Sequence, residues 1–201
     1  MLYLLSILAC VIVVAVINAI FIASRLNYHT WEMFIWAFVV TFVVIAIDGL
    51  FATLVRWVCP KKWFLVNKGH FKAGKKEARF YEKIGIKKWK DKVLELGSLT
   101  SFRKNKISEP NNNEYVARYI LEANYGVSVH LCGMIFGFAC MFCCPLNLSL
   151  TIGLPVAIIN VFYNFLSFAI LRYNLPKLYT LYKFNARKLE RQKALEKKEN
   201  K

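Results

Sequence analysis

The chain has 201 residues, a length that suits one domain. Hydrophobic residues make up 57% of it and its formal net charge is +16, a combination that favours apolar membrane spans with basic residues outside them. Nucleic acid is a common partner of basic chains, but no motif of a nucleic-acid-binding module is present, so we expect anionic lipid headgroups of a bilayer instead.

The pattern predicts an all-α integral membrane protein with about four transmembrane helices, two of them in residues 1–58. Residues 2–23 have no basic residue before their apolar core, so we expect an uncleaved span rather than a signal peptide. Residues 34–58 form the second span, flanked by tryptophans as at membrane interfaces. Asp48 lies within it, and an ionisable residue there marks either a functional site or a buried polar partner.

Residues 59–125 form a basic segment with cytoplasmic, interfacial amphipathic helices. In 86-IKKWKDKVLEL-96 the apolar residues recur at helical spacing and lysines occupy the other faces, which predicts a helix at the membrane surface. A shorter helix is expected before Gly85. A plain linker does not explain this periodicity, so the segment is an anchor or an anchor that also builds a site.

Residues 126–171 hold the third and fourth predicted spans, and a helix beginning near Glu114 is expected to run into the third. That helix would place Glu122 and His130 about two turns apart. A histidine at the edge of a span is either a hydrogen-bonded interfacial residue or a general base. No nucleophile motif, nucleotide-binding motif or metal-ligand spacing is present, so we expect no metal, no cofactor and no disulfide.

In the fourth span, Asn160, Asn164 and Ser167 form one polar stripe, at i, i+4 and i+7. Hydrogen bonding between helices and a possible intramembrane polar site with Asp48 are both open as explanations. Gly133 and Gly137 form a GxxxG pattern in the third span, which is typical of closely packed helices but also frequent by chance.

Residues 172–201 form a basic tail, predicted to be a solvated helix or an electrostatic tether to anionic lipid. More than half of the 28 lysines and arginines lie in the basic middle segment, and most others lie in this tail. The positive-inside rule therefore places both in the cytoplasm, and four spans place the N-terminus there too. The sequence predicts a multi-pass protein of the cell membrane and leaves its oligomeric state open.

Several short motifs between about residues 80 and 180 resemble those of the glycosyl-diaponeurosporenoate acyltransferases, small multi-span bacterial membrane proteins. These motifs are 89-WKD-91, 102-FRK-104, Glu122 with His130, Asn164, and 172-RYN-174. The residues that correspond by position are Trp89, Lys90, Asp91, Phe102, Lys104, Glu122, His130, Asn164, Arg172, Tyr173 and Asn174. The chain departs from the pattern at Tyr125, Val127 and Leu131, where a basic, an acidic and an aromatic residue would stand.

The resemblance implies a membrane acyltransferase that esterifies a hydroxyl of a lipid or glycolipid with a fatty acyl group at the cytoplasmic interface. In that hypothesis His130 is the general base and Glu122 orients it. Arg172, Lys90 and Lys104 receive phosphates of an acyl donor, an acyl thioester or a phospholipid, and Asn164 donates to the oxyanion. The alternative is a non-enzymatic scaffold, lipid-binding protein or partner subunit, which the departures favour.

Overall fold

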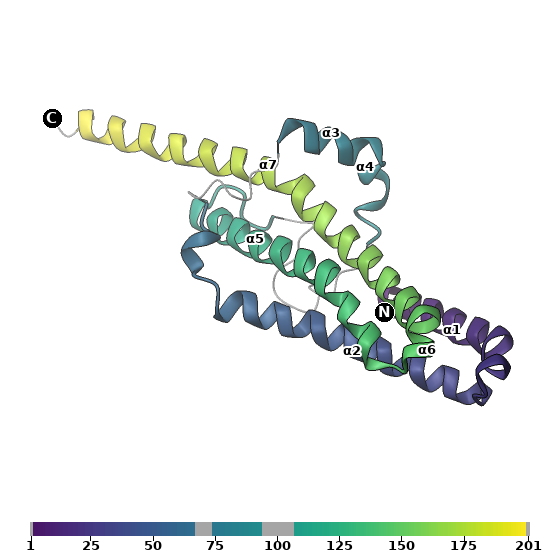
Figure 1. The fold of residues 1–201 in the computed structure, drawn as a ribbon. Coiled ribbons are helices and arrows are strands. Elements are labelled where there is room, and N and C mark those ends of the chain that lie inside the picture. The colour runs from purple at the N-terminus through teal and green to yellow at the C-terminus, as the bar shows by residue number, and fades with distance from the viewer. Residues whose placement is uncertain (1, 67–73, 94–106, 200–201) are drawn as a thin grey trace. The chain divides into compact units, whose positions relative to one another are not determined.

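The computed structural model describes residues 2–66, 74–93 and 107–199, and these are helical almost throughout (Figure 1). No β-strand occurs in these three ranges, so the all-α prediction is confirmed. Contacts divide the chain into two compact units. The first comprises Met1–Val58, Lys92–Glu95 and Ser128–Phe168, and the second comprises Cys59–Asp91, Leu96–Val127 and Ala169–Lys201.

The first unit begins with two apolar helices that lie side by side, α1 (Leu2–Phe21) and α2 (Thr30–Trp57) (Figure 1). They pack closely because small side chains occupy their interface. Ala15 and Ala37 are fully buried there, and so is Met33. Between helices in a membrane, where lipid tails are as apolar as these side chains, such close approach contributes stability through van der Waals contacts.

The rest of the first unit comes from two long helices and the turn that joins them. The end of α5 (Asn113–Phe136) continues into the 3-10 helix η5 (Gly137–Cys143). The short helix α6 (Leu146–Leu148) and the π-helix η6 (Ser149–Gly153) then precede α7 (Leu154–Glu199). Pro145 is the N-cap of α6 and lies in the connection between the two long helices.

Three helical segments are long and apolar enough to cross a membrane: Thr30–Trp57, Asn113–Cys143 and Leu146–Lys198. They correspond to the second, third and fourth predicted spans. The N-terminal apolar helix, Leu5–Phe21, is shorter than these three, and its role as a fourth span stays a prediction. Many large apolar side chains of the first unit are exposed, as lipid-facing side chains would be; they include Phe42, Trp57, Phe142 and Leu146.

The second unit contains α3 (Lys75–Lys83), α4 (Ile86–Trp89), the start of α5 and the end of α7. Gly85 separates α3 from α4 with a φ of 73°, a left-handed conformation that glycine adopts without steric cost. The short helix expected before Gly85 is therefore confirmed.

The helix predicted over residues 86–96 is shorter than expected. Residues 86–89 are α-helical, 90–92 form a turn, and 94–96 lie outside the described residues. Lys88 and Lys92 would stand four residues apart on the same helix face, and like charges at that spacing destabilise a helix. The apolar periodicity does place Ile86 correctly, since its side chain is fully buried.

Candidate functional sites

A polar cluster lies in the first unit, where α2, α5 and α7 each contribute side chains that are buried or half-buried. It consists of Asp48, His130, Asn160 and Asn164. Nδ1 of His130 lies 2.8 Å from Oδ1 of Asn164, and Nδ2 of Asn164 donates to Oδ2 of Asp48 at 3.0 Å. Nδ2 of Asn164 also lies 2.9 Å from Oδ1 of Asn160. Asn160 and Asn164 of the polar stripe thus form hydrogen bonds between helices, which was one of the two explanations that the sequence left open.

These contacts favour one tautomer of His130. The amide nitrogen of Asn164 faces two acceptors, Asp48 and Asn160, so its oxygen must be the atom that faces the imidazole. An amide oxygen only accepts, and Nδ1 of His130 therefore carries the proton. In the neutral ring the lone pair is then on Nε2, the atom through which this histidine can act as a base.

Gly133 and Gly137 make room for the cluster. A Cβ atom at position 133 would lie 2.5 Å from Oδ1 of Asp48 and 2.9 Å from Oδ1 of Asn164, and one at position 137 would collide with Nδ2 of Asn160. The backbone also takes part, since Nδ2 of Asn160 donates to the carbonyl oxygen of Gly133 at 3.2 Å. The GxxxG pattern therefore has the close-packing role that its spacing indicates.

One oxygen of Asp48 stands out. Oδ1 is buried and has no hydrogen-bond partner among the described residues, whereas Oδ2 is bonded to Asn164. Unsatisfied buried polar atoms are uncommon and usually have a functional or structural reason. Asp48 is thus both a partner of a neighbouring span and a candidate for a functional role.

The second unit has an ion pair between α3 and α7. Nε of Arg172 donates to Oε1 of Glu77 at 2.7 Å and its terminal NH2 group donates to Oε2 at 2.6 Å, the two-pronged geometry that makes arginine–carboxylate pairs strong. The hydroxyl of Tyr81 donates to the same carboxylate at 3.1 Å. Arg172, which the sequence suggested for donor phosphates, is thus already paired with a carboxylate.

Both acidic groups of this contact have shifted pKa values. Burial raises the pKa of the Glu77 carboxyl, but hydrogen bonds from Arg172 and its positive charge outweigh burial, so this pKa lies below its usual value. Burial, followed by the negative charge of Glu77, raises the pKa of Tyr81 to about 12. Glu77 is therefore ionised and Tyr81 neutral at physiological pH.

Two other residues from the motifs line one cavity. Lys90 and Asn174, far apart in the sequence, border a space of about 220 Å³ in the second unit. Tyr173 faces another partner, with its hydroxyl 3.4 Å from Oε1 of Glu82. Trp89 donates from Nε1 to the carbonyl oxygen of Ile84 at 3.2 Å.

The remaining predicted residues are placed as follows. Asp91 is exposed and pairs with Lys90 at 2.8 Å. Glu122 is half-buried in the second unit, whereas His130 belongs to the first, and the orienting role of Glu122 stays a prediction. Phe102 and Lys104 lie outside the described residues.

The departures from the motif pattern occupy apolar surroundings. Tyr125 is buried and its ring lies 4.4 Å from that of Phe64, while Val127 is buried as well. Leu131 is exposed. The positions at which the pattern has a basic and an acidic residue thus contribute here to the packing of the second unit.

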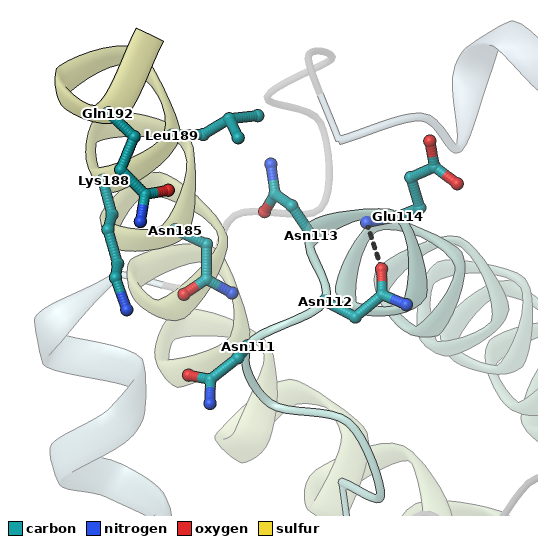
Figure 2. Close-up of a pocket in the computed structure, with 8 residues that line it drawn as sticks. All are labelled: Asn111, Asn112, Asn113, Glu114, Asn185, Lys188, Leu189 and Gln192. Atoms are coloured by element: carbon teal, nitrogen blue, oxygen red, sulfur yellow. Dashed lines mark hydrogen bonds between the residues drawn. The ribbon is translucent and has the colours of Figure 1, made fainter. Parts of the chain in front are cut away.

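A second cavity, of about 310 Å³, is lined mainly by amide side chains at the start of α5 and near the end of α7 (Figure 2). Asn112 caps α5, because its Oδ1 accepts hydrogen bonds from the backbone nitrogens of Glu114 and Tyr115, each at 3.1 Å. Asn185 donates to the carbonyl oxygen of Pro110 at 2.7 Å. These amides have structural roles that hold the two helices together at this end of the unit.

The family of the chain follows from a comparison with known families. The family model for glycosyl-4,4'-diaponeurosporenoate acyltransferase matches residues 60–184, more than half of the chain. The chain belongs to this family. No curated protein and no solved structure matches it. The family match includes His130, Asn160 and Asn164 but not Asp48, and together with the apolar helices it indicates an acyltransferase-like protein of a membrane.

Sequence reasoning missed several residues of these sites. Glu77, Tyr81 and Lys177 lie among many charged and aromatic residues of the basic segment and tail, and no spacing singles them out. Asn124 was missed too, although it is fully buried and donates to the carbonyl oxygen of Phe64 at 2.8 Å. A polar residue within an apolar helical face was the available signal for Asn124.

Within the described residues, no group of three histidine, cysteine, aspartate or glutamate side chains is arranged to hold a metal ion.

Proposed function

We propose that the protein is a membrane-bound acyltransferase that esterifies a hydroxyl group of a lipid or glycolipid with a fatty acyl group. The observation that carries this proposal is the hydrogen bond from Nδ1 of His130 to Asn164, which leaves the basic lone pair on Nε2. Family membership supplies the class of reaction. A histidine with a defined tautomer supplies the base that this reaction needs.

In the proposed reaction Nε2 of His130 takes the proton of the acceptor hydroxyl as its oxygen attacks the carbonyl carbon of the acyl donor. The bond to the leaving group then breaks, and the imidazolium returns the proton to that group. The donor would be an acyl thioester or a phospholipid, and no other cofactor is required. A new ester and a protonated leaving group are the products.

Asn164 acts here as a positioning residue rather than as the oxyanion donor that the sequence suggested. Its nitrogen already donates to Asp48 and Asn160, and its oxygen accepts from His130. Asp48 polarises the amide of Asn164, and the amide oxygen in turn stabilises the imidazolium formed during the transfer. This chain from carboxylate through amide to imidazole explains why a charged residue is kept in an apolar helix.

We further propose the setting of this reaction. The protein would be a multi-pass protein of the cell membrane with both termini in the cytoplasm, and its basic residues would face anionic lipid headgroups and a lipid-like substrate. The concentration of lysine and arginine in the middle segment and the tail supports this orientation.

A second candidate is a non-enzymatic lipid-binding or partner subunit of the same family. The observation that favours it is the burial of Tyr125 and Val127 at positions where the motif pattern has a base and an acid. Such a protein would keep the fold and the membrane location of the family without turnover.

Comparative lipidomics separates these two functions. Cells expressing wild type, His130→Ala, His29→Ala or an empty vector are compared for lipids that gain the mass of an acyl group. We expect such a lipid with wild type and His29→Ala, because His29 is an exposed residue at the start of α2. His130→Ala should insert into the membrane normally and produce none of it.

Either of two results would overturn the proposal. Identical lipid profiles in all four strains, with the protein abundant and folded, would favour the non-enzymatic candidate. An acylated lipid that His130→Ala produces as well as wild type would show that another group is the base. Glu122→Gln tests the orienting role separately and should lower the rate without abolishing it.

A further inference from the structure

The cavity bordered by Lys90 and Asn174 has the chemistry of a phosphate site. Its other cation is Lys177, on α7. Among the described residues that line the cavity there is no carboxylate, so these side chains together carry a net positive charge. An ammonium group is a compact point charge that suits phosphate oxygens, and the amide of Asn174 adds donors.

Neither lysine is committed to a strong internal partner. Nζ of Lys90 pairs with Asp91 at 2.8 Å; the side chain of Lys90 is 28% exposed, but that of Asp91 is 64% exposed, so water weakens the pair. Nζ of Lys177 lies 4.0 Å from the centre of the Tyr173 ring, a cation–π contact that holds the ammonium without neutralising it. Both cations can therefore turn to an anionic ligand.

Arg172 contrasts with these two lysines. Its guanidinium is bound by two hydrogen bonds to Glu77, and its side chain is only 15% exposed. Breaking that contact would leave a partly buried carboxylate unpaired, which is costly. Of these two cations of α7, Lys177 and not Arg172 is thus available to a phosphate.

The remaining walls of the cavity are apolar. Ile107, Leu178 and Leu181 line it together with Tyr119, and Leu178 and Tyr119 are buried. Lysines beside an apolar wall fit a ligand with an anionic head and a hydrocarbon part. A free inorganic anion would use the lysines alone and would gain nothing from that wall.

We propose that this cavity binds the phosphate group of an acyl-bearing amphiphile. The phosphate belongs to either of two ligands, a phospholipid or an acyl-coenzyme A thioester, since both carry a phosphate ester and an acyl chain in one molecule. The inference rests on the proposed acyl transfer for the reason such a ligand is bound. Binding itself requires no turnover, so it is tested independently of catalysis.

The test measures binding to the purified full chain in neutral detergent micelles. The probes are lauroyl-coenzyme A, lauroyl lysophosphatidylglycerol and monolaurin, which has the same acyl chain without a phosphate. The variant Lys90→Gln/Lys177→Gln removes both cations. The matched control Lys88→Gln/Lys183→Gln removes two exposed lysines from α4 and α7, outside the cavity, with the same change in net charge.

We expect the cavity variant to weaken binding of a phosphate-bearing probe about tenfold or more, since two charge-assisted contacts are lost. The control variant should bind as wild type does, and monolaurin should not distinguish the proteins. Lys90→Arg/Lys177→Arg should keep most of the affinity because it keeps both charges. An effect on lauroyl-coenzyme A alone identifies a thioester ligand, and an effect on the lysophospholipid alone identifies a phospholipid.

Three outcomes would overturn the inference: wild type binds neither phosphate probe, the cavity variant binds both as tightly as wild type, or the control loses as much affinity as the cavity variant. The last result would assign binding to the overall charge of the protein. If the cavity variant loses phosphate binding while the lipid profiles of all strains in the cell experiment are identical, the inferred phosphate site stands and only the proposed catalysis is disproved.

Discussion

The two units stabilise their polar side chains in different ways. In the first unit a single carboxylate, that of Asp48, is joined to His130 through the neutral amide of Asn164. In the second unit Glu77 and Arg172 meet as opposite full charges with two hydrogen bonds. Amides can satisfy donors and acceptors among apolar helices without adding charge, whereas an ion pair needs both partners in place.

The units also differ in how the helices bring these polar side chains together. In the first, glycines let the helix backbone approach the polar side chains, so that the positions of Asp48 and Asn164 depend on the missing Cβ of Gly133. In the second, long side chains reach across from α3 to α7, and Tyr81 adds a third hydrogen bond. The first contact is therefore sensitive to volume and the second to charge, and each can be disrupted separately.

The largest effect is expected from Gly133→Ala. Its new Cβ would lie 2.5 Å from Oδ1 of Asp48, so the cluster must rearrange or the helices must separate. Overpacking and lost hydrogen bonds together should lower the free energy of unfolding by about 3 kcal/mol, measured by denaturation in mixed micelles. Acyl transfer should fall as well, because Asn164 would no longer hold His130.

Gly49→Ala is the matched control for that substitution. It adds the same methyl group to a helix of the first unit, but nothing lies within 4 Å of the new atom. Alanine is the better helix former by about 1 kcal/mol, so stability should stay unchanged or rise slightly. Equal stability of Gly133→Ala and Gly49→Ala would contradict the close approach at Gly133.

A smaller effect, dependent on pH, is expected from Glu77→Gln. At neutral pH the loss of the charged contact with Arg172 should lower the free energy of unfolding by about 2 kcal/mol. Because the pKa of Glu77 is lower in the folded state, its contribution is present above the ordinary carboxyl pKa of about 4.3. It is lost as the pH falls through the lowered folded value.

Unfolding of wild type and Glu77→Gln is therefore compared across the acid range, where the difference between them should shrink toward zero. Lys87→Gln serves as the control, since it removes an ion pair with Glu82 whose side chains are 64% and 44% exposed. That variant should unfold as wild type does. A difference between wild type and Glu77→Gln that stays constant down to strongly acidic pH would show that the charge of Glu77 is not what stabilises the contact.

The sequence predicted the long elements of this fold well, because an apolar run of span length leaves few alternatives to a helix. It also predicted a helix that begins near Glu114, and α5 begins at Asn113. It failed at residues 90–92, where helical periodicity competes with the repulsion of neighbouring lysines. The periodicity of a short charged segment is weaker evidence than the length of an apolar one.

The candidate sites were predicted in part, and the difference again has a physical cause. Polar residues in apolar spans are conspicuous, and so Asp48, His130, Asn160 and Asn164 were all singled out before the structure brought them together. The basic segment and the tail contain many charged residues, so no single charged residue there stands out as a site residue. Pairing of Glu77 with Arg172 depends on how α3 lies against α7, which no local pattern encodes.

The smallest effect is expected at a contact of a third kind, the cap of α5 by Asn112 (Figure 2). Asn112→Ala leaves the backbone nitrogens of Glu114 and Tyr115 without this acceptor and should lower the free energy of unfolding by about 1 kcal/mol. Asn112→Asp keeps the acceptor oxygen of the cap, but it replaces the hydrogen bond from Nδ2 to Oε2 of Glu109 at 2.7 Å by a repulsion between carboxylates, so it should recover only part of the stability. Asn111→Ala changes an exposed neighbour beside the same cavity and should have no effect. Equal losses in Asn111→Ala and Asn112→Ala would assign the effect to the cavity as a whole. A loss in Asn112→Ala that is absent from Asn111→Ala would show that one side chain and two backbone groups stabilise this end of the second unit locally. Such a contact depends neither on the close packing seen at Gly133 nor on a pair of full charges like that of Glu77 and Arg172.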